Sequence, residues 1–207
     1  MLARESYRHG DLRQALLDAA LEMASEGGPD AVVLREATRR AGVSPNAAYR
    51  HFADRTELVE AVSDAAQSRV AGAIEAEWDA VPATLDAPVA AHAHLRAVGR
   101  GYLGFARDEP GLFRAAFTVP SDLNTALAPE KAGPGGRTSF QLLSIALDEL
   151  VAVGALPAER RPGAEFSAWS AVHGLAMLVL EGPLRDLDPE VARGAGARLI
   201  DMVDRGL

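Results

Sequence analysis

Polar and basic side chains gather between residues 44 and 55. The residues able to form hydrogen bonds there are Ser44, Asn46, Tyr49, Arg50, His51 and Arg55. Residues 35–55 hold five basic and two acidic residues, so the local charge is positive. Hydroxyl, amide, imidazole and guanidinium groups on a positive background suit hydrogen bonds to DNA phosphates and base edges. The segment therefore indicates nucleic-acid recognition.

Motifs of catalysis and of metal binding are missing from the sequence. It contains no nucleophile elbow, no glycine loop for phosphates or dinucleotides, and no HExxH zinc motif. It has no cysteine, and His92 and His94 are two residues apart, which puts them on different faces of a helix. We therefore expect no enzyme, no cofactor and no metal. A helical adaptor that binds only protein stays open as the alternative to a DNA-binding protein.

Three short helices are predicted to position the polar segment. Apolar residues at steps of three and four mark the first helix, which ends at Gly27-Gly28-Pro29. A second helix covers residues 34–41, and Gly42 permits a tight turn after it. Ser44 is a good N-cap for a third helix that runs from Asn46 to about Phe52. This pattern is typical of a helix-turn-helix, in which the third helix enters the major groove, although many other helical proteins contain such a turn.

The remainder of the chain predicts a larger helical body. Strand signals are nearly absent. The expected helices cover about 55–78, 88–107, 109–117, 135–154, 162–181 and 188–205, and a mobile loop rich in Pro, Gly, Ser and Thr is expected over 118–137. The predicted fold is therefore all-α, with a helix-turn-helix DNA-binding domain over 1–55 and a larger helical domain over 56–207.

The net charge of −8 lies in the body. Residues 1–55 hold eight basic and eight acidic residues, so residues 56–207 carry the whole excess. An acidic body repels nonspecific DNA contact. No run of about 18 uncharged apolar residues is present, and the N-terminus lacks the apolar core of a signal peptide. Together with the absence of cysteine, these features favour a cytoplasmic protein without membrane contact.

Residues 41–62, AGVSPNAAYRHFADRTELVEAV, resemble the recognition element of the TetR/AcrR family of transcription regulators. The AGVS turn, the Tyr-x-His-Phe element and a following basic residue, Arg55, are all in register, and the resemblance extends over about 8–62. One departure is Val33, where the family usually has Thr or Ser to open the second helix. The resemblance implies a homodimer that binds a palindromic DNA operator, with repression as the usual outcome.

The resemblance also implies roles for individual residues. Those matching the family's phosphate-contacting set are Ser44, Tyr49, His51 and Arg55. Those matching positions that vary with the operator are Pro45, Asn46 and Arg50. Asn46 could bind adenine, and Arg50 could bind either guanine or another phosphate. Phe52 matches the residue that plugs the core.

The body resembles the family more loosely, and the resemblance implies that residues 56–207 form a helical ligand-binding and dimerisation domain. Trp169, His173 and Gly174 match the Trp-x-x-x-His-Gly signature of one C-terminal subgroup, and in the family the last two long helices form a four-helix dimer interface. The residues of the body that could line an effector cavity are Tyr102, Phe105, Phe113, Phe117, Trp169, His173 and Met177. Simple core packing is the alternative for these aromatics. An apolar or amphipathic small molecule is the expected effector, because no cluster of Lys or Arg stands beside the aromatics to bind a nucleotide.

Overall fold

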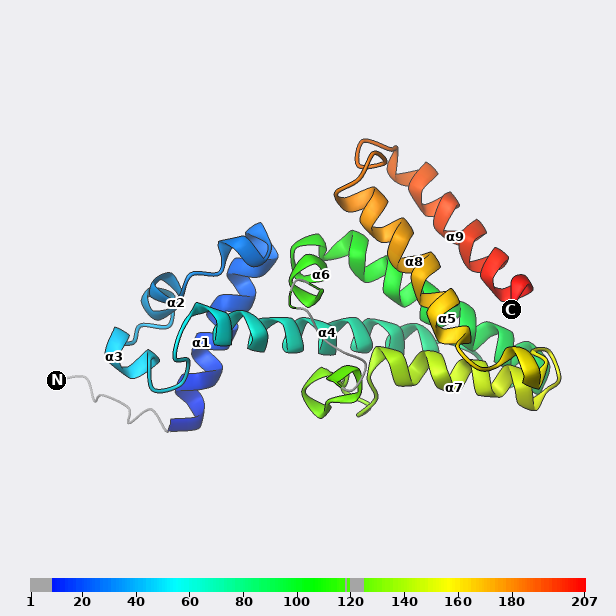
Figure 1. Cartoon of the computed structure of the whole chain (residues 1–207), viewed down its shortest axis with the longest axis horizontal. Helices are drawn as coiled ribbons and strands as arrows, with labels where there is room; N and C mark the ends of the chain where they lie inside the picture. Colours follow the sequence, from blue (N-terminus) through cyan, green and yellow to red (C-terminus); the bar gives the residue numbers. More distant parts are fainter. Residues whose placement is uncertain (1–8, 118, 120–124) are drawn as a thin grey trace. The chain divides into compact units, whose positions relative to one another are not determined.

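The chain is helical throughout the residues that the computed structural model describes, which are 9–117, 119 and 125–207 (Figure 1). The α-helices are α1 (His9–Gly27), α2 (Leu34–Arg40), α3 (Pro45–Ala48), α4 (Arg55–Asp79), α5 (Ala87–Asp108), α6 (Pro110–Ala116), α7 (Ser139–Ala152), α8 (Ala164–Leu180) and α9 (Pro189–Gly206). Short 3-10 helices lie at Pro29–Ala31, Thr125–Leu127, Pro129–Lys131 and Ala158–Arg160. Within these ranges there is no strand, and the predicted all-α fold is confirmed.

The described residues fold as two compact units. The first, here called the head, contains 9–66, 109–117 and 119, and the second, the body, contains 67–108 and 125–207. The division differs from the predicted boundary at residue 55 in two ways. Helix α4 continues from the head into the body, and α6 belongs to the head although it follows α5 of the body in sequence.

The core of the head forms where α1, α2 and α6 pack together. The apolar stripe of α1 is buried, with Leu16 and Ala20 fully inaccessible. Phe52, which follows α3, is also fully buried. Helix α6 approaches α1 very closely, because a Cβ atom on Gly111 would lie 2.3 Å from the carbonyl oxygen of Ala24. A glycine at this position therefore permits the contact between the two backbones.

The body is built around α5, which packs against α7, α8 and α9. Its close approach to α4 depends on Gly101, where a Cβ atom would lie 2.5 Å from the Cα atom of Ile74. Helix α7 starts at a capping box between Thr138 and Gln141, in which each side chain accepts a hydrogen bond from the other's backbone N–H. That cap places the start of α7 at Ser139, four residues later than the sequence predicted.

The predicted loop over 118–137 is only partly described, because 118 and 120–124 lie outside the described residues. After its two 3-10 helices, the loop wraps around the buried carboxylate of Glu75 on α4. The backbone N–H of Gly135 donates to Glu75 Oε2 at 2.8 Å, and Arg137 Nε lies 3.7 Å from Oε1. The described part of the loop is therefore fixed to α4. No helix of the described chain is long and apolar enough to span a bilayer.

Candidate nucleic-acid interface and body pocket

The turn between α2 and α3 has the predicted geometry. Gly42 adopts φ +68°, the left-handed region in which a side chain is strained. Ser44 caps α3, since its Oγ accepts a hydrogen bond from the backbone N–H of Ala47 at 3.3 Å. No side chain caps α2 at Val33, as the departure from the family pattern suggested. The turn is therefore formed by Gly42 and Ser44, and the backbone N–H groups of Gly42 and Val43 bond back to Arg39 and Thr38.

The third helix is shorter than predicted, because it ends at Ala48 rather than near Phe52. Beyond Ala48 the backbone N–H groups of Arg50 and His51 bond back three residues, to Ala47 and Ala48, as in a tighter 3-10 turn. The N–H of Phe52 again reaches back four residues, to Ala48. The segment thus stays compact up to the residue that enters the core.

The predicted DNA-contacting side chains face outward. Ser44, Pro45, Asn46, Tyr49, Arg50 and Arg55 are exposed, and His51 is half-buried. Tyr49 keeps 59% of its surface exposed, whereas Phe52 keeps 0%. Two aromatic residues one turn apart therefore have opposite environments, one available for an external contact and one within the core.

Several arginines near this face already have partners in the head. The guanidinium of Arg39, together with that of Arg40, lowers the pKa of Glu36 to about 2 through hydrogen bonds. Arg40 also pairs with Glu26 at 2.9 Å. Arg50 has no ion pair among the described residues. Its charge is therefore not neutralised by a protein carboxylate.

Arg55 has a structural partner that the sequence did not reveal. Its Nε donates to the carbonyl oxygen of Val32 at 2.7 Å and its Nη2 to that of Pro29 at 2.9 Å. These bonds hold the segment before α2 against the start of α4. The remaining N–H groups of the guanidinium are available to an external acceptor.

Three of the predicted effector residues meet in the body. Tyr102 Oη lies 2.8 Å from His173 Nδ1 and accepts a hydrogen bond from Trp169 Nε1 at 3.2 Å. Burial lowers the pKa of His173, which favours a neutral imidazole at pH 7. Because the Tyr102 hydroxyl accepts from Trp169, its own O–H can donate to His173 Nδ1. The trio ties α5 to α8.

Other predicted effector residues lie elsewhere. Phe113 is fully buried in the head, and its ring is 5.0 Å from that of Phe117. Both therefore belong to a different unit from Tyr102. Met177 is half-buried on α8. Phe105 is the one member of the predicted set that lines the pocket described next.

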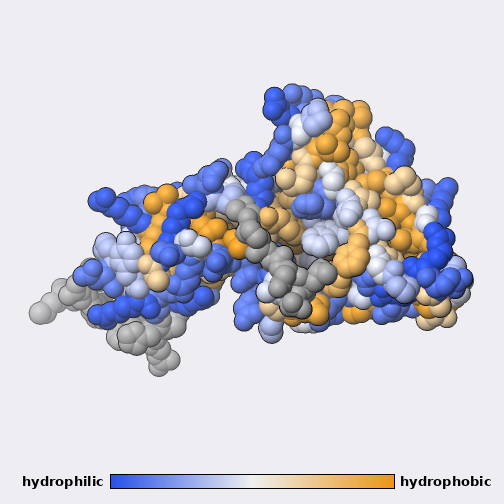
Figure 2. All heavy atoms as spheres, in the orientation of Figure 1, coloured by the Kyte–Doolittle hydropathy of each residue, from blue (hydrophilic) through white to orange (hydrophobic). Residues whose placement is uncertain are grey.

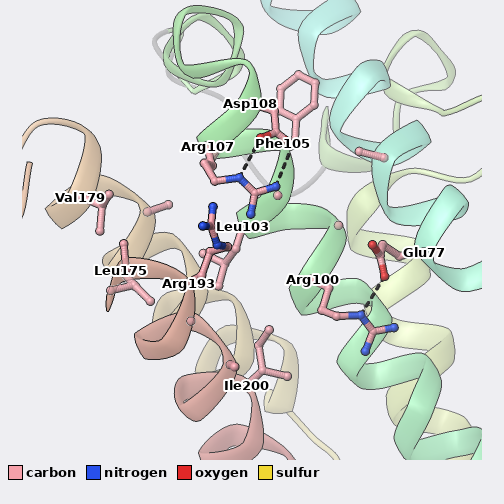
Figure 3. Close-up of a pocket in the computed structure, with 18 of the residues that line it drawn as sticks. Glu77, Arg100, Leu103, Phe105, Arg107, Asp108, Leu175, Val179, Arg193 and Ile200 are labelled. Atoms are coloured by element: carbon pink, nitrogen blue, oxygen red, sulfur yellow. Dashed lines mark hydrogen bonds and ion pairs between the residues drawn. The ribbon is translucent and has the colours of Figure 1, made fainter. Parts of the chain in front are cut away.

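The body contains an open pocket of about 580 Å³ between α4, α5, α8 and α9 (Figure 3). Its apolar lining is Ala73, Ala76, Gly101, Leu103, Gly104, Phe105, Ala106, Leu175, Ala176, Val179, Leu180, Ala192, Gly196, Ala197 and Ile200. Its charged lining is Glu77, Arg100, Arg107, Asp108 and Arg193. The volume and the mainly apolar wall are typical of small-molecule sites, which range from about 300 to 1,000 Å³.

The charged residues of this pocket were missed by the sequence reasoning, which found no cluster of Lys or Arg beside the aromatics. Arg100 and Arg107 are seven residues apart on α5 and so share the helix face that includes Leu103 and Gly104. This spacing was available in the sequence. Arg193 comes from α9, and only the folded body brings it to the same pocket.

Comparison with known families identifies the chain. Residues 95–203 match the family described as "Tetracyclin repressor-like, C-terminal domain", and residues 16–62 match "Bacterial regulatory proteins, tetR family". The chain belongs to the TetR family. TetR proteins are transcription regulators that bind DNA through the helix-turn-helix of the head.

The chain is also similar to individual proteins. The HTH-type transcriptional regulator AcrR of Shigella flexneri is 34% identical over 80 residues, which cover 38% of this chain and 37% of that relative. A Rhodococcus sp. RHA1 protein of unknown function is 27% identical with a TM-score of 0.72, and the match covers 99% of both chains. TetR-Q116A from Acinetobacter baumannii AYE, solved with minocycline, is 19% identical with a TM-score of 0.56 over 97% of this chain and 96% of that one. At 19% identity, the similarity to this last structure shows only that the two chains share a fold.

Proposed function

We propose that this chain is a ligand-responsive repressor that binds a palindromic operator as a homodimer. The observation that carries the proposal is the arrangement after Gly42, where Asn46, Tyr49 and Arg50 face outward while Phe52 anchors the segment in the core. In this proposal Ser44, Tyr49, His51 and Arg55 contact phosphates, and Pro45, Asn46 and Arg50 face the bases.

The proposed dimer interface is the outer surface of α8 and α9. Phe166 and Leu178 on α8 and Val191 and Met202 on α9 are large apolar residues that stay exposed in the single chain. Figure 2 shows hydrophobic residues gathered on this part of the body surface. A second copy would bury them by the self-complementary contact of a two-fold axis. Gly196 of α9 faces Leu103 within the body.

The proposed effector site is the body pocket, with Phe105 as a direct contact. Tyr102, Trp169 and His173 would support it by fixing α5 against α8, two of its walls. Membership of the Trp-x-x-x-His-Gly subgroup is part of the proposal, since Trp169 and His173 share Tyr102 as a partner. Minocycline in the TetR relative from A. baumannii illustrates that a protein of this fold can hold a small molecule.

Chain connectivity offers two routes from the pocket to the head. Ala73, Ala76 and Glu77 line the pocket from α4, and the same helix begins in the head at Arg55. Asp108, the last residue of α5, also lines the pocket, and Glu109 directly after it accepts a hydrogen bond from Ser25 Oγ on α1. A ligand that moves α4 or the end of α5 would thus act on elements of the head.

Two arginine substitutions test the DNA face. Arg50→Ala is expected to change the order of preference among duplex sequences, because its unpaired guanidinium is assigned to a base edge. Arg55→Ala should weaken binding to all duplexes and reduce the salt dependence of binding by about one ion per head. Fluorescence anisotropy with a panel of labelled duplexes at several salt concentrations measures both effects.

The control separates charge from the structural bonds of Arg55. Arg55→Lys keeps the positive charge, so it should preserve the salt slope better than Arg55→Ala. It cannot donate to both Pro29 and Val32 in the same geometry, so it still loses the structural bonds of Arg55. The assignments are wrong if Arg55→Ala changes base preference while leaving the salt slope intact, or if Arg50→Ala lowers all affinities equally.

A further inference from the structure

The body pocket has charge at its two ends and an apolar wall between them (Figure 3). At one end Arg100 Nε donates to Glu77 Oε2 at 2.7 Å, which gives a balanced pair. At the other end Arg107, Asp108 and Arg193 lie together, and Arg193 is also paired with Glu190, which is outside the pocket lining. Seven residues of α5 separate the ends, or about 10 Å along the helix. The second end therefore has two guanidinium groups, and the first has one.

Each of the two arginines at the second end has N–H groups that its carboxylate partner does not use. Arg107 uses Nε and Nη2 to bind both carboxylate oxygens of Asp108, and Arg193 uses the same two nitrogens to bind Glu190. In the described chain, Nη1 of neither arginine donates to a protein atom. The charge of Arg193 also reaches Asp108, whose pKa is lowered first by the hydrogen bond from Arg107 and also by Arg193. Both guanidinium groups can thus donate a hydrogen bond to one further anion.

Gly104 leaves space beside these donors. A Cβ atom built there would meet only Arg107 Nη2, at 3.9 Å, so a side chain could be accommodated at this position. Gly101, one turn earlier, is different, because a Cβ there would collide with the backbone of α4. The open volume at Gly104 therefore belongs to the pocket and leads from its apolar wall to Arg107.

We propose that the pocket binds an amphipathic monocarboxylate, with its hydrocarbon part along Leu103, Phe105 and Leu175 and its carboxylate between Arg107 and Arg193. This inference rests on the proposed function and names the chemical class of its effector. A guanidinium binds a carboxylate with charge-assisted, often bidentate hydrogen bonds. Two guanidinium groups beside one opening suit a single carboxylate, whereas the acidic excess of residues 56–207, with a net charge of −8, opposes a polyanion.

Three probes of equal chain length test this inference: decanoate, decanol and decyltrimethylammonium, each below its micelle concentration. We expect decanoate to bind at least about tenfold more tightly than decanol, because hydrogen bonds to a charged carboxylate are about twice as strong as those to a neutral hydroxyl. The cationic probe should bind most weakly. Isothermal titration calorimetry with the full-length protein measures the three affinities.

Matched variants locate the carboxylate. Arg107→Gln and Arg193→Gln should each lower decanoate affinity about tenfold and leave decanol affinity unchanged. Arg198→Gln removes a charge from α9 outside the pocket lining and should change neither. Gly104→Leu fills the pocket and should weaken both probes, while a leucine in place of glycine favours the helix. Thermal unfolding of each variant verifies that it folds.

Three results would overturn the inference: no decanoate binding, equal binding of decanoate and decanol, or no effect of the two glutamine variants. It would also fall if these variants weakened self-association without changing probe affinity, because the pocket would then be a contact between copies. An operator titration with decanoate separates this inference from the proposed function. If decanoate binds through the two arginines but leaves operator affinity unchanged, the proposed ligand switch is contradicted. If decanol changes operator affinity and decanoate does not, only the proposal of a carboxylate ligand is contradicted.

Discussion

Replacing Phe52 with alanine is expected to lower the free energy of unfolding by about 3–5 kcal/mol. The side chain is fully buried in the head, and the guanidinium of Arg13 lies 4.9 Å from the centre of its ring. Small domains have total free energies of unfolding of about 5–15 kcal/mol, so this loss would be a large part of the total stability. DNA affinity should fall with it, because the ring anchors the segment that carries Tyr49 and Arg50. Urea unfolding followed by circular dichroism measures the change in stability.

Tyr49→Ala is the matched control for that substitution. Tyr49 is aromatic and one turn from Phe52, but it is 59% exposed and should change stability by less than about 0.5 kcal/mol. DNA affinity should nevertheless fall by about tenfold or more through the lost phosphate contact. If Phe52→Ala left the unfolding midpoint unchanged, or if Tyr49→Ala lowered stability as much as Phe52→Ala, the assigned roles would be wrong. These roles are Phe52 as the anchor in the core and Tyr49 as a contact to DNA.

Effector binding is expected to weaken operator affinity about 5- to 150-fold, which corresponds to a coupling free energy of about 1–3 kcal/mol. The physical reason is that α4 forms part of the pocket wall with Ala73 and Ala76 and also belongs to the head from Arg55. A shift of α4 would change the spacing of two heads that must reach major grooves about 34–36 Å apart. Operator titrations with and without a pocket ligand measure this coupling.

Reciprocity gives this prediction an internal control. Operator DNA must weaken ligand binding by the same factor, because both affinities belong to one thermodynamic cycle. Gly104→Leu, which fills the pocket, should bind the operator normally and lose the response to ligand. A ligand that occupies the pocket of the native protein and leaves operator affinity unchanged contradicts the switch for that ligand.

Local patterns predicted much of the head. The cap at Ser44 and the positive φ of Gly42 follow from short-range sequence signals, because each depends on a few neighbouring residues. The burial of Phe52 was expected from the resemblance to the TetR/AcrR family. The length of α3 was predicted less well from the sequence. The change from four-residue to three-residue hydrogen bonds after Ala48 has no strong signature in the sequence.

Long-range contacts set the limit of sequence reasoning. Helix α6 was predicted near its observed position, but its membership of the head depends on the close approach of Gly111 to Ala24. Phe113 therefore joins the core of the head, although the sequence placed it with Phe105 among residues that could line one cavity. Arg193 reaches the body pocket only because α9 packs against α5. Such encounters between distant segments are not encoded in periodicity or capping.

The central claim is that the head recognises specific duplex DNA, and selection from a random duplex pool with the purified protein tests it most directly. The double variant Tyr49→Ala with Arg50→Ala is the control, since both side chains are exposed and the head should stay folded. We expect the native protein to enrich a pseudo-palindrome, and sedimentation equilibrium to show two or a higher even number of chains per selected duplex. Enrichment no greater than that of the double variant, or tight binding by a single chain to an asymmetric site, would contradict the account.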